Sequence, residues 1–125
     1  MRTKEWLNEK DCYEFEYKGY KCEIKRIPSL GHLCGYVYTD LFKDLEYDVV
    51  PIICHGGITF NGVTNTGNWA IGFDCAHMMD YVPYVEEIRI HVGKYSFKQY
   101  RNVEYVTKEL HKVVDQIIKF KEANK

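Results

Sequence analysis

The feature that most restricts how this chain can fold is an apolar stripe close to its C-terminus. From residue 103 to residue 120, apolar side chains recur at steps of three and four, the period of one face of an α-helix, and Asn102 precedes them as a capping residue. The stripe consists of Val103, Val106, Leu110, Val113, Ile117 and Phe120, and Val114 and Ile118 widen it. Such a helix has to bury its apolar face, so the rest of the chain must supply the layer that covers it.

The N-terminal part of the chain predicts that this layer is a β-sheet. In residues 12–27, apolar and charged residues alternate in two arms on either side of Lys18-Gly19, which is typical of an antiparallel hairpin with one wet face. Shorter strand patterns follow at residues 35–38, 58–60 and 69–73, and a polar loop is expected over residues 61–68.

Three segments have less regular patterns. Residues 39–48 carry apolar side chains at helical spacing and predict one or two turns of helix. Residues 49–53 form an apolar run broken by Pro51, which predicts a sheet edge or an extended connection. Residues 85–92 alternate like a strand, but the two glutamates near their start also fit a helix N-terminus, and both assignments remain open.

Strands that precede one long helix predict an α+β fold: an antiparallel sheet with an N-terminal hairpin, packed against a long C-terminal helix. A chain of 125 residues is long enough for one hydrophobic core and too short for two ordinary domains, so residues 1–125 are expected to form a single domain. The apolar stripe is also compatible with a homo-oligomer, although packing on the sheet explains it equally well.

Charge and composition exclude several classes of function. The chain has 17 basic and 18 acidic residues and a formal net charge of -1, which gives no general attraction to duplex nucleic acid. Its charged N-terminus lacks the apolar core of a signal peptide, and no stretch approaches the roughly 18 apolar residues of a membrane span. We therefore expect a cytosolic protein without a membrane partner, in which the five cysteines are reduced thiols.

Three histidines lie within two positions of a cysteine, a pattern that could indicate a zinc-binding site. The pairs are His32 with Cys34, His55 with Cys54, and His77 with Cys75. Imidazole and thiolate are preferred zinc ligands, but no Cys-x-x-Cys pair is present, and a free cysteine is commonly a small buried hydrophobe. The spacing therefore favours packing over a structural zinc site.

A second constellation of polar residues follows the strand expected at residues 69–73. If the chain turns helically there, Asp74, His77 and Asp80 fall at steps of three and share one face. Together with His55 they could hold a divalent metal, and His55, His77 or Asp74 could act as a catalytic general base. The alternative is structural: Asp74 caps a turn, His77 bonds locally and Asp80 is solvated.

The segment His55-Gly56-Gly57 resembles glycine-rich turns whose backbone N–H groups receive an anion. Gly-Gly also serves any tight turn, and the fingerprints of phosphate loops and dinucleotide folds are absent from the sequence. Trp69 fits core packing better than base stacking, although a clamp on a nucleobase would use such a residue. The residues expected to contact a ligand are His55, Gly56, Gly57, Trp69, Asp74, His77 and Asp80.

Four motifs in one order resemble a family of small bacteriophage and prophage proteins. They are residues 31–37 (GHLCGYV), 55–60 (HGGITF), 69–80 (WAIGFDCAHMMD) and 103–106 (VEYV). This family is largely uncharacterised, so the resemblance implies a viral origin, and with it the host cytoplasm, rather than an activity.

A viral origin favours a role in host defence or host metabolism. Our leading hypothesis is a cytosolic phage accessory protein that binds a small, nucleotide-derived molecule at the His55 glycine turn and the cluster at residues 74–80, and that could act against host defence. The first alternative is a metal-dependent hydrolase, in which the same residues supply ligands or a general base for a metal-bound water. The second is an interaction module that inhibits a host enzyme through its tyrosine-rich hairpin, including Tyr13 and Tyr17.

Overall fold

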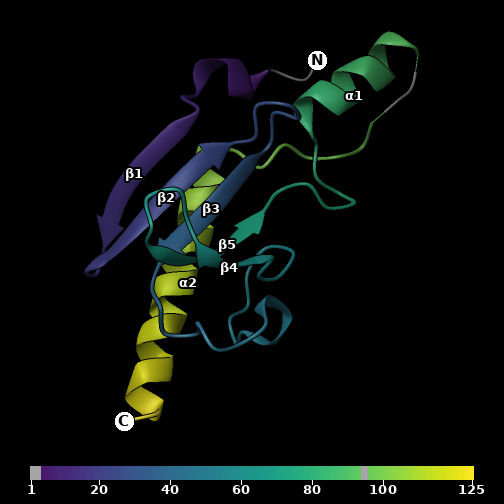
Figure 1. Ribbon diagram of the computed structural model, residues 1–125. Helices are drawn as coiled ribbons and strands as arrows, with labels where there is room; N and C mark the ends of the chain where they lie inside the picture. Colours follow the sequence, from purple (N-terminus) through teal and green to yellow (C-terminus); the bar gives the residue numbers. More distant parts are fainter. Residues whose placement is uncertain (1–3, 94–95) are drawn as a thin grey trace.

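The computed structural model describes residues 4–93 and 96–125 and has the expected α+β architecture (Figure 1). Its five strands are β1 (Cys12–Tyr17), β2 (Tyr20–Arg26), β3 (Leu33–Tyr38), β4 (Phe60–Val63) and β5 (Trp69–Asp74). They form one antiparallel sheet in the order β1-β2-β3-β5-β4. The helices are α1 (Pro83–His91) and α2 (Val103–Ala123), and η1 (Glu5–Asn8) and η2 (Tyr47–Val49) are short 3-10 helices. α2 lies across one face of the sheet, whereas α1 projects away from it.

The N-terminal hairpin is confirmed. Tyr17 pairs with Tyr20, so Lys18 and Gly19 form a two-residue turn. Both turn residues have positive φ, 49° and 85°, as the commonest tight hairpin turn requires, and glycine adopts this conformation at no steric cost. The turn therefore sets the register of the first two strands.

The tyrosine-rich face of this hairpin turns toward α2. Tyr13, Phe15 and Tyr17 are half-buried and pack against the hydrophobic core. The ring of Tyr17 stacks on His111 of α2, with 3.9 Å between the ring centroids. These side chains belong to the packing of the domain itself, and an interface built on them would have to share them with α2.

α2 carries the core of the domain. Its capping residue is Asn102, whose side chain accepts a hydrogen bond of 2.8 Å from the backbone N–H of Tyr105. The predicted stripe faces the sheet, and its fully buried members are Val106, Leu110, Val113, Val114 and Ile117. α2 approaches the sheet closely at Gly35, because glycine has no side chain there: a Cβ atom would lie 2.9 Å from Phe73 Cζ and 3.1 Å from Leu110 Cδ2. The long C-terminal helix and its packing on the sheet are thus confirmed.

Two predictions about the middle of the chain are wrong. The helix expected over residues 39–48 does not form, and this segment consists of turns that lead into η2. The side-chain amide of Asn61 donates to the carbonyl oxygens of Phe42 and Leu45, which holds the segment as a loop against β4. β4 also begins later than expected and takes up residues 60–63, because this stretch of the expected loop pairs with β5.

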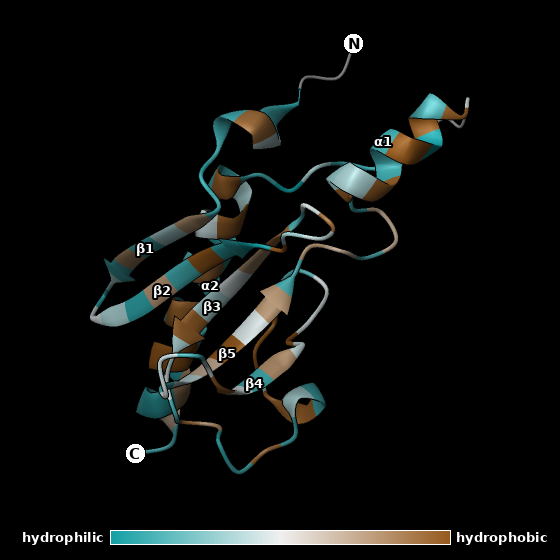
Figure 2. Ribbon diagram, turned by 45° about the horizontal axis from the view of Figure 1, so that its top comes forward, coloured by the Kyte–Doolittle hydropathy of each residue, from teal (hydrophilic) through white to brown (hydrophobic). Residues whose placement is uncertain are grey.

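The structure decides between the alternatives that the sequence left open for residues 49–53 and 85–92. Residues 50–53 form an irregular connection outside the sheet, in which the N–H of Ile52 donates to the carbonyl oxygen of Val50 over 2.8 Å. The segment that fits either a strand or a helix is α1, which begins at Pro83, where the fixed φ of proline suits the first helical turn. α1 buries Glu86 and exposes apolar side chains such as Ile88. Figure 2 shows hydrophobic and hydrophilic positions interspersed along the ribbon of α1, which stands apart from the sheet. Among the helices of the described residues, none is long and apolar enough to cross a membrane.

Because Leu110 packs between α2 and Gly35 of the sheet, truncating it should leave a cavity in the centre of the core. We expect Leu110→Ala to lower the free energy of unfolding by about 2–5 kcal/mol, the range for large-to-small changes in a packed core. Lys119→Ala, on the exposed side of the same helix, should change it by less than about 0.5 kcal/mol. Urea unfolding of both variants measures the difference, and equal effects would contradict this packing.

Candidate functional site

Asp80 lies at the centre of a buried polar cluster beyond the end of β5. The chain leaves β5 at Asp74 and makes a tight turn, in which the N–H of Asp80 donates to the carbonyl oxygen of His77 over 2.9 Å. Asp80 then forms a parallel bridge with Gln99, which brings the segment before α2 alongside. Asp80 is only 1% exposed. A carboxylate buried to this degree needs partners that replace water.

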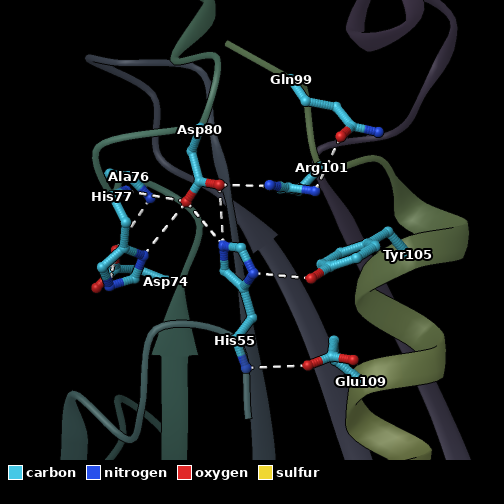
Figure 3. Close-up of polar contacts among 9 residues, drawn as sticks. All are labelled: His55, Asp74, Ala76, His77, Asp80, Gln99, Arg101, Tyr105 and Glu109. Atoms are coloured by element: carbon cyan, nitrogen blue, oxygen red, sulfur yellow. Dashed lines mark hydrogen bonds and ion pairs between the residues drawn. The ribbon is translucent and has the colours of Figure 1, made fainter.

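Three side chains and one backbone N–H surround the Asp80 carboxylate (Figure 3). His55 Nε2 lies 2.9 Å from Oδ1 and 2.8 Å from Oδ2. Arg101 Nε donates to Oδ1 over 2.9 Å. His77 reaches Oδ2 with its backbone N–H, at 2.9 Å, and with its ring Nδ1, at 3.2 Å. The cluster thus joins the glycine turn, the turn after β5 and the segment that leads into α2.

α2 fixes the position of His55. Its Nδ1 lies 2.8 Å from the hydroxyl oxygen of Tyr105, and its backbone N–H donates to Glu109 Oε1 over 2.9 Å. Because an ionised carboxylate can only accept, His55 donates from Nε2 to Asp80. In the tautomer that carries a proton on Nε2 alone, Nδ1 accepts from the Tyr105 hydroxyl. Tyr105 and Glu109 are one helical turn apart, so both project from the same side of α2.

These contacts set the ionisation of Asp80. Burial alone would raise the pKa of this carboxyl group, because water no longer solvates its charge. Hydrogen bonds from His55, from Arg101 and from the backbone N–H of His77 outweigh the burial and hold the pKa below its usual value. Asp80 is therefore a carboxylate at neutral pH.

Asp74, His77 and Asp80 come together as the sequence predicts, although the segment is a turn and not a helix. His77 Nε2 lies 3.8 Å from Asp74 Oδ1, while its Nδ1 faces Asp80. Asp74 Oδ1 also accepts from the backbone N–H of Ala76 over 3.1 Å, which is the turn-capping role expected in the structural alternative. Asp80 is buried rather than solvated, so that part of the structural alternative is wrong.

The glycine pair has a steric role in the site. Gly56 has a φ of 68°, and a Cβ atom there would overlap the imidazole of His77, so this ring packs directly on the Gly56 backbone. Gly57 has a φ of 83°, and a Cβ atom there would meet nothing within 4 Å. The N–H of Gly57 donates to the carbonyl oxygen of Cys54 over 2.9 Å, so it is engaged within the turn. Anion binding by this turn stays a prediction.

Trp69 does not join the cluster. It opens β5 whereas Asp74 closes it, and the strand places the two residues about 16 Å apart along its length. The indole Nε1 of Trp69 donates to Asn61 Oδ1 over 2.7 Å, beside a separate surface cleft. The expected ligand-binding set is therefore divided between the two ends of β5, and a small ligand at Asp80 does not also contact Trp69.

The cysteines do not contribute to a metal cluster among residues 4–93 and 96–125. The one group there with three ligand atoms close together is His55, His77 and Asp80, whose atoms lie within 4.8 Å of one another, and it does not include Asp74. Burial raises the pKa of Cys34 to about 12 and that of Cys54 to about 12, so these thiols stay protonated and behave as small hydrophobes.

Sequence reasoning missed Arg101 and Glu109, and it gave Tyr105 no role in the site. Glu109 is only 6% exposed, and its place beside the apolar stripe of a helix was a signal that it is buried with a partner. Tyr105 lies off the stripe within one of the four motifs. Arg101 precedes the capping residue, where no periodic pattern marks it.

Comparisons of the chain with protein-family models, with curated proteins and with solved structures found no match. Only the geometry of the site therefore indicates its chemistry. A buried carboxylate between two imidazoles can hold a cation, and it can also position the neighbouring arginine and tyrosine for a ligand.

Replacing the central carboxylate should destabilise the fold in a pH-dependent way. Asp80→Asn removes the charge that faces His55 and Arg101, and we expect it to lower the free energy of unfolding at pH 7 by about 3 kcal/mol. Because the folded-state pKa of Asp80 is depressed, its stabilising effect is complete above the unfolded-state pKa of about 3.9 and is lost as the pH falls through the folded value. Denaturant unfolding of the unaltered protein and of Asp80→Asn should show that the difference between their free energies of unfolding becomes smaller only in this acidic range. A difference that grows on acidification would contradict the assignment.

The glycine pair offers a matched test of how His77 is placed. Gly56→Ala and Gly57→Ala impose similar backbone strain, roughly 1–2 kcal/mol each, because both residues have positive φ. Gly56→Ala alone also drives a methyl group into the His77 ring. We therefore expect only Gly56→Ala to separate the rings of His55 and His77, whose centroids are 5.5 Å apart. Nuclear Overhauser contacts between the two imidazoles measure this, and their survival in Gly56→Ala would refute the packing.

Proposed function

We propose that the protein binds a small, nucleotide-derived anion in a cleft beside the Asp80 cluster. The cleft has a volume of about 570 Å³, which is within the range of roughly 300–1,000 Å³ typical of small-ligand sites. Its walls come from the segment before α2, from the first turns of α2 and from the N-terminal 3-10 helix. The lining residues are Glu5, Phe97, Lys98, Gln99, Tyr100, Asn102, Glu104, Tyr105 and Lys108.

The side chains of this cleft suit a ligand that combines an aromatic ring with a phosphate. Phe97 is 80% exposed, and together with Tyr105 it offers aromatic surface, on which any nucleobase can stack. Lys98 and Lys108 supply positive charge, and Lys98 also pairs with the buried carboxylate of Glu86 over 3.1 Å. Lys108 pairs with Glu104 over 3.1 Å, and both side chains are largely exposed. Exposed pairs of this kind are weak, so a phosphate can compete for the lysine.

Tyr105 connects the cleft with the cluster, and this contact carries the proposal. The residue lines the cleft while its hydroxyl oxygen lies 2.8 Å from His55 Nδ1. The guanidinium of Arg101 lies over the ring of Tyr105, 5.0 Å from its centroid. Through His55 and Arg101, the Asp80 carboxylate holds the tyrosine in place before any ligand arrives. A preorganised side chain loses less entropy when the ligand binds.

The resemblance to small phage proteins supports this choice of ligand. Accessory proteins of such phages often act on host defence or host metabolism, and a nucleotide-derived signal is a target that a protein of this size can sequester. Sequestration in the host cytoplasm requires no nucleophile, which agrees with the lack of a recognisable serine or cysteine nucleophile motif in the sequence. We therefore propose binding against host defence as the role.

Isothermal titration against a panel of cyclic and ADP-ribose-type nucleotides tests this function. We expect one ligand per chain, and Tyr105→Ala should bind it about 5–150-fold more weakly, the equivalent of ~1–3 kcal/mol of lost stacking. Tyr47→Ala is the matched control, because Tyr47 is exposed in η2 and does not line the cleft. The proposal would be refuted if no nucleotide bound at high micromolar concentration, or if Tyr47→Ala lowered the affinity as much as Tyr105→Ala.

A further inference from the structure

We propose that His55, His77 and Asp80 form a binding site for one zinc-class divalent ion. One ligand atom from each residue lies within 4.8 Å of the other two, and within residues 4–93 and 96–125 this is the one group of its kind. The inference does not rest on the nucleotide proposal, because none of these three residues lines the cleft.

The two distances that join Asp80 Oδ2 to the imidazoles are already close to the spacing that a metal would impose, and the two imidazole nitrogens lie within 4.8 Å of one another. With bonds of about 2.0 Å to nitrogen and oxygen, neighbouring ligands of a tetrahedral ion lie roughly 3.3 Å apart. In the structure, Asp80 Oδ2 is 2.8 Å from His55 Nε2 and 3.2 Å from His77 Nδ1. Small movements of these side chains would therefore admit an ion, which would replace the ring protons directed at the carboxylate.

Both histidines have an outer partner that leaves the other ring nitrogen facing the carboxylate. The hydroxyl oxygen of Tyr105 lies 2.8 Å from His55 Nδ1, so Nε2 faces Asp80. Asp74 Oδ1 lies 3.8 Å from His77 Nε2, which is within ion-pair distance but too long for a hydrogen bond, while Nδ1 faces Asp80. In metal sites, outer partners orient the ligand imidazole and accept its remaining N–H. When an ion replaces the proton on Nε2, the neutral His55 ring carries its proton on Nδ1, which then donates to the Tyr105 hydroxyl oxygen.

Arg101 leaves one oxygen of Asp80 for the ion. Its Nε donates to Oδ1 over 2.9 Å, whereas Oδ2 faces both imidazoles and accepts from the backbone N–H of His77 over 2.9 Å, so an ion would use the remaining lone pair of Oδ2. The positive charge of Arg101 opposes that of a metal ion, but the two would act on different oxygens. The carboxylate of Asp74 adds negative charge on the side of His77, where the ion would sit.

The ligand types and their exposure indicate the class of metal. Two imidazole nitrogens and one carboxylate oxygen suit Zn²⁺ or a similar first-row ion, whereas Mg²⁺ and Ca²⁺ prefer oxygen ligands. The side chain of His77 is 35% exposed and that of Asp80 is 1% exposed, so solvent reaches the site from the side of His77. Three protein ligands with an open position are typical of catalytic zinc sites, and a water bound there is what the hydrolase hypothesis requires.

Zinc titration and native mass spectrometry of chelator-treated protein test the site. The unaltered protein should bind one Zn²⁺ per chain. Asp74→Asn, which removes an outer partner, should weaken binding about 10–100-fold, and His77→Ala, which removes a ligand, should weaken it further. His91→Ala, an exposed histidine of α1, should leave the affinity unchanged. Thermal unfolding without metal checks that each variant is folded, and His77→Gln replaces His77→Ala if the latter is not.

The exposed thiol of Cys12 is the competing zinc ligand that the experiment must exclude. Cys12→Ser should still bind one ion, and X-ray absorption of the zinc-loaded protein should show nitrogen and oxygen ligands without sulfur. Loss of zinc in Cys12→Ser, undiminished binding in the His77 variants, or no binding by the unaltered protein would each overturn the proposal. Nucleotide binding is measured on the metal-free protein. If zinc does not bind, the cleft proposal is unaffected, and if the nucleotides do not bind, the zinc proposal is unaffected.

Discussion

One end of this fold depends on the burial of the Asp80 carboxylate. Moving an ionised carboxylate out of water is unfavourable by several kcal/mol unless other groups replace the lost solvation. His55, His77 and Arg101 do so here, and they come from three segments that the sheet alone does not hold together. The Asp80 carboxylate contacts all three segments, so we expect the region beyond β5 to order cooperatively.

α2 positions the segment that leads into the glycine turn. The side chain of Gln116 accepts from the backbone N–H of Ile53 and donates to its carbonyl oxygen, over 2.7 Å in each case. Glu109 accepts from the backbone N–H of His55, and Tyr105 contacts its ring. Along this stretch, side chains of α2 take the place of the neighbouring strand that an extended segment would otherwise need. One face of the helix thus serves the core, and an adjoining row of side chains places His55.

The spacing of residues in the sequence correctly predicted those elements that interactions between near neighbours in the chain determine. The hairpin and α2 follow from alternation and from the helical stripe, and the steps of three between residues 74 and 80 correctly bring a histidine between two carboxylates. The helix expected over residues 39–48 fails because the amide of Asn61, distant in sequence, binds carbonyl oxygens in that segment. Trp69 lies away from the site because it stands at the opposite end of β5 from Asp74. Arg101 is close to Asp80 because the bridge between Asp80 and Gln99 places its segment there, and no local sequence pattern predicts this bridge.

The exposure of the cluster argues for a role beyond stability. Well-packed apolar residues stabilise a core at least as well as a buried ion pair does, so burying these charges adds little stability by itself. The side chains of Asp80 and His55 are 1% and 12% exposed, yet His77 leaves about a third of its side chain at the surface beside the oxygen it contacts. A cluster that served the fold alone would gain from covering this ring. Packed on the bare backbone of Gly56, His77 is the point where the buried charge can meet an ion or a ligand from outside.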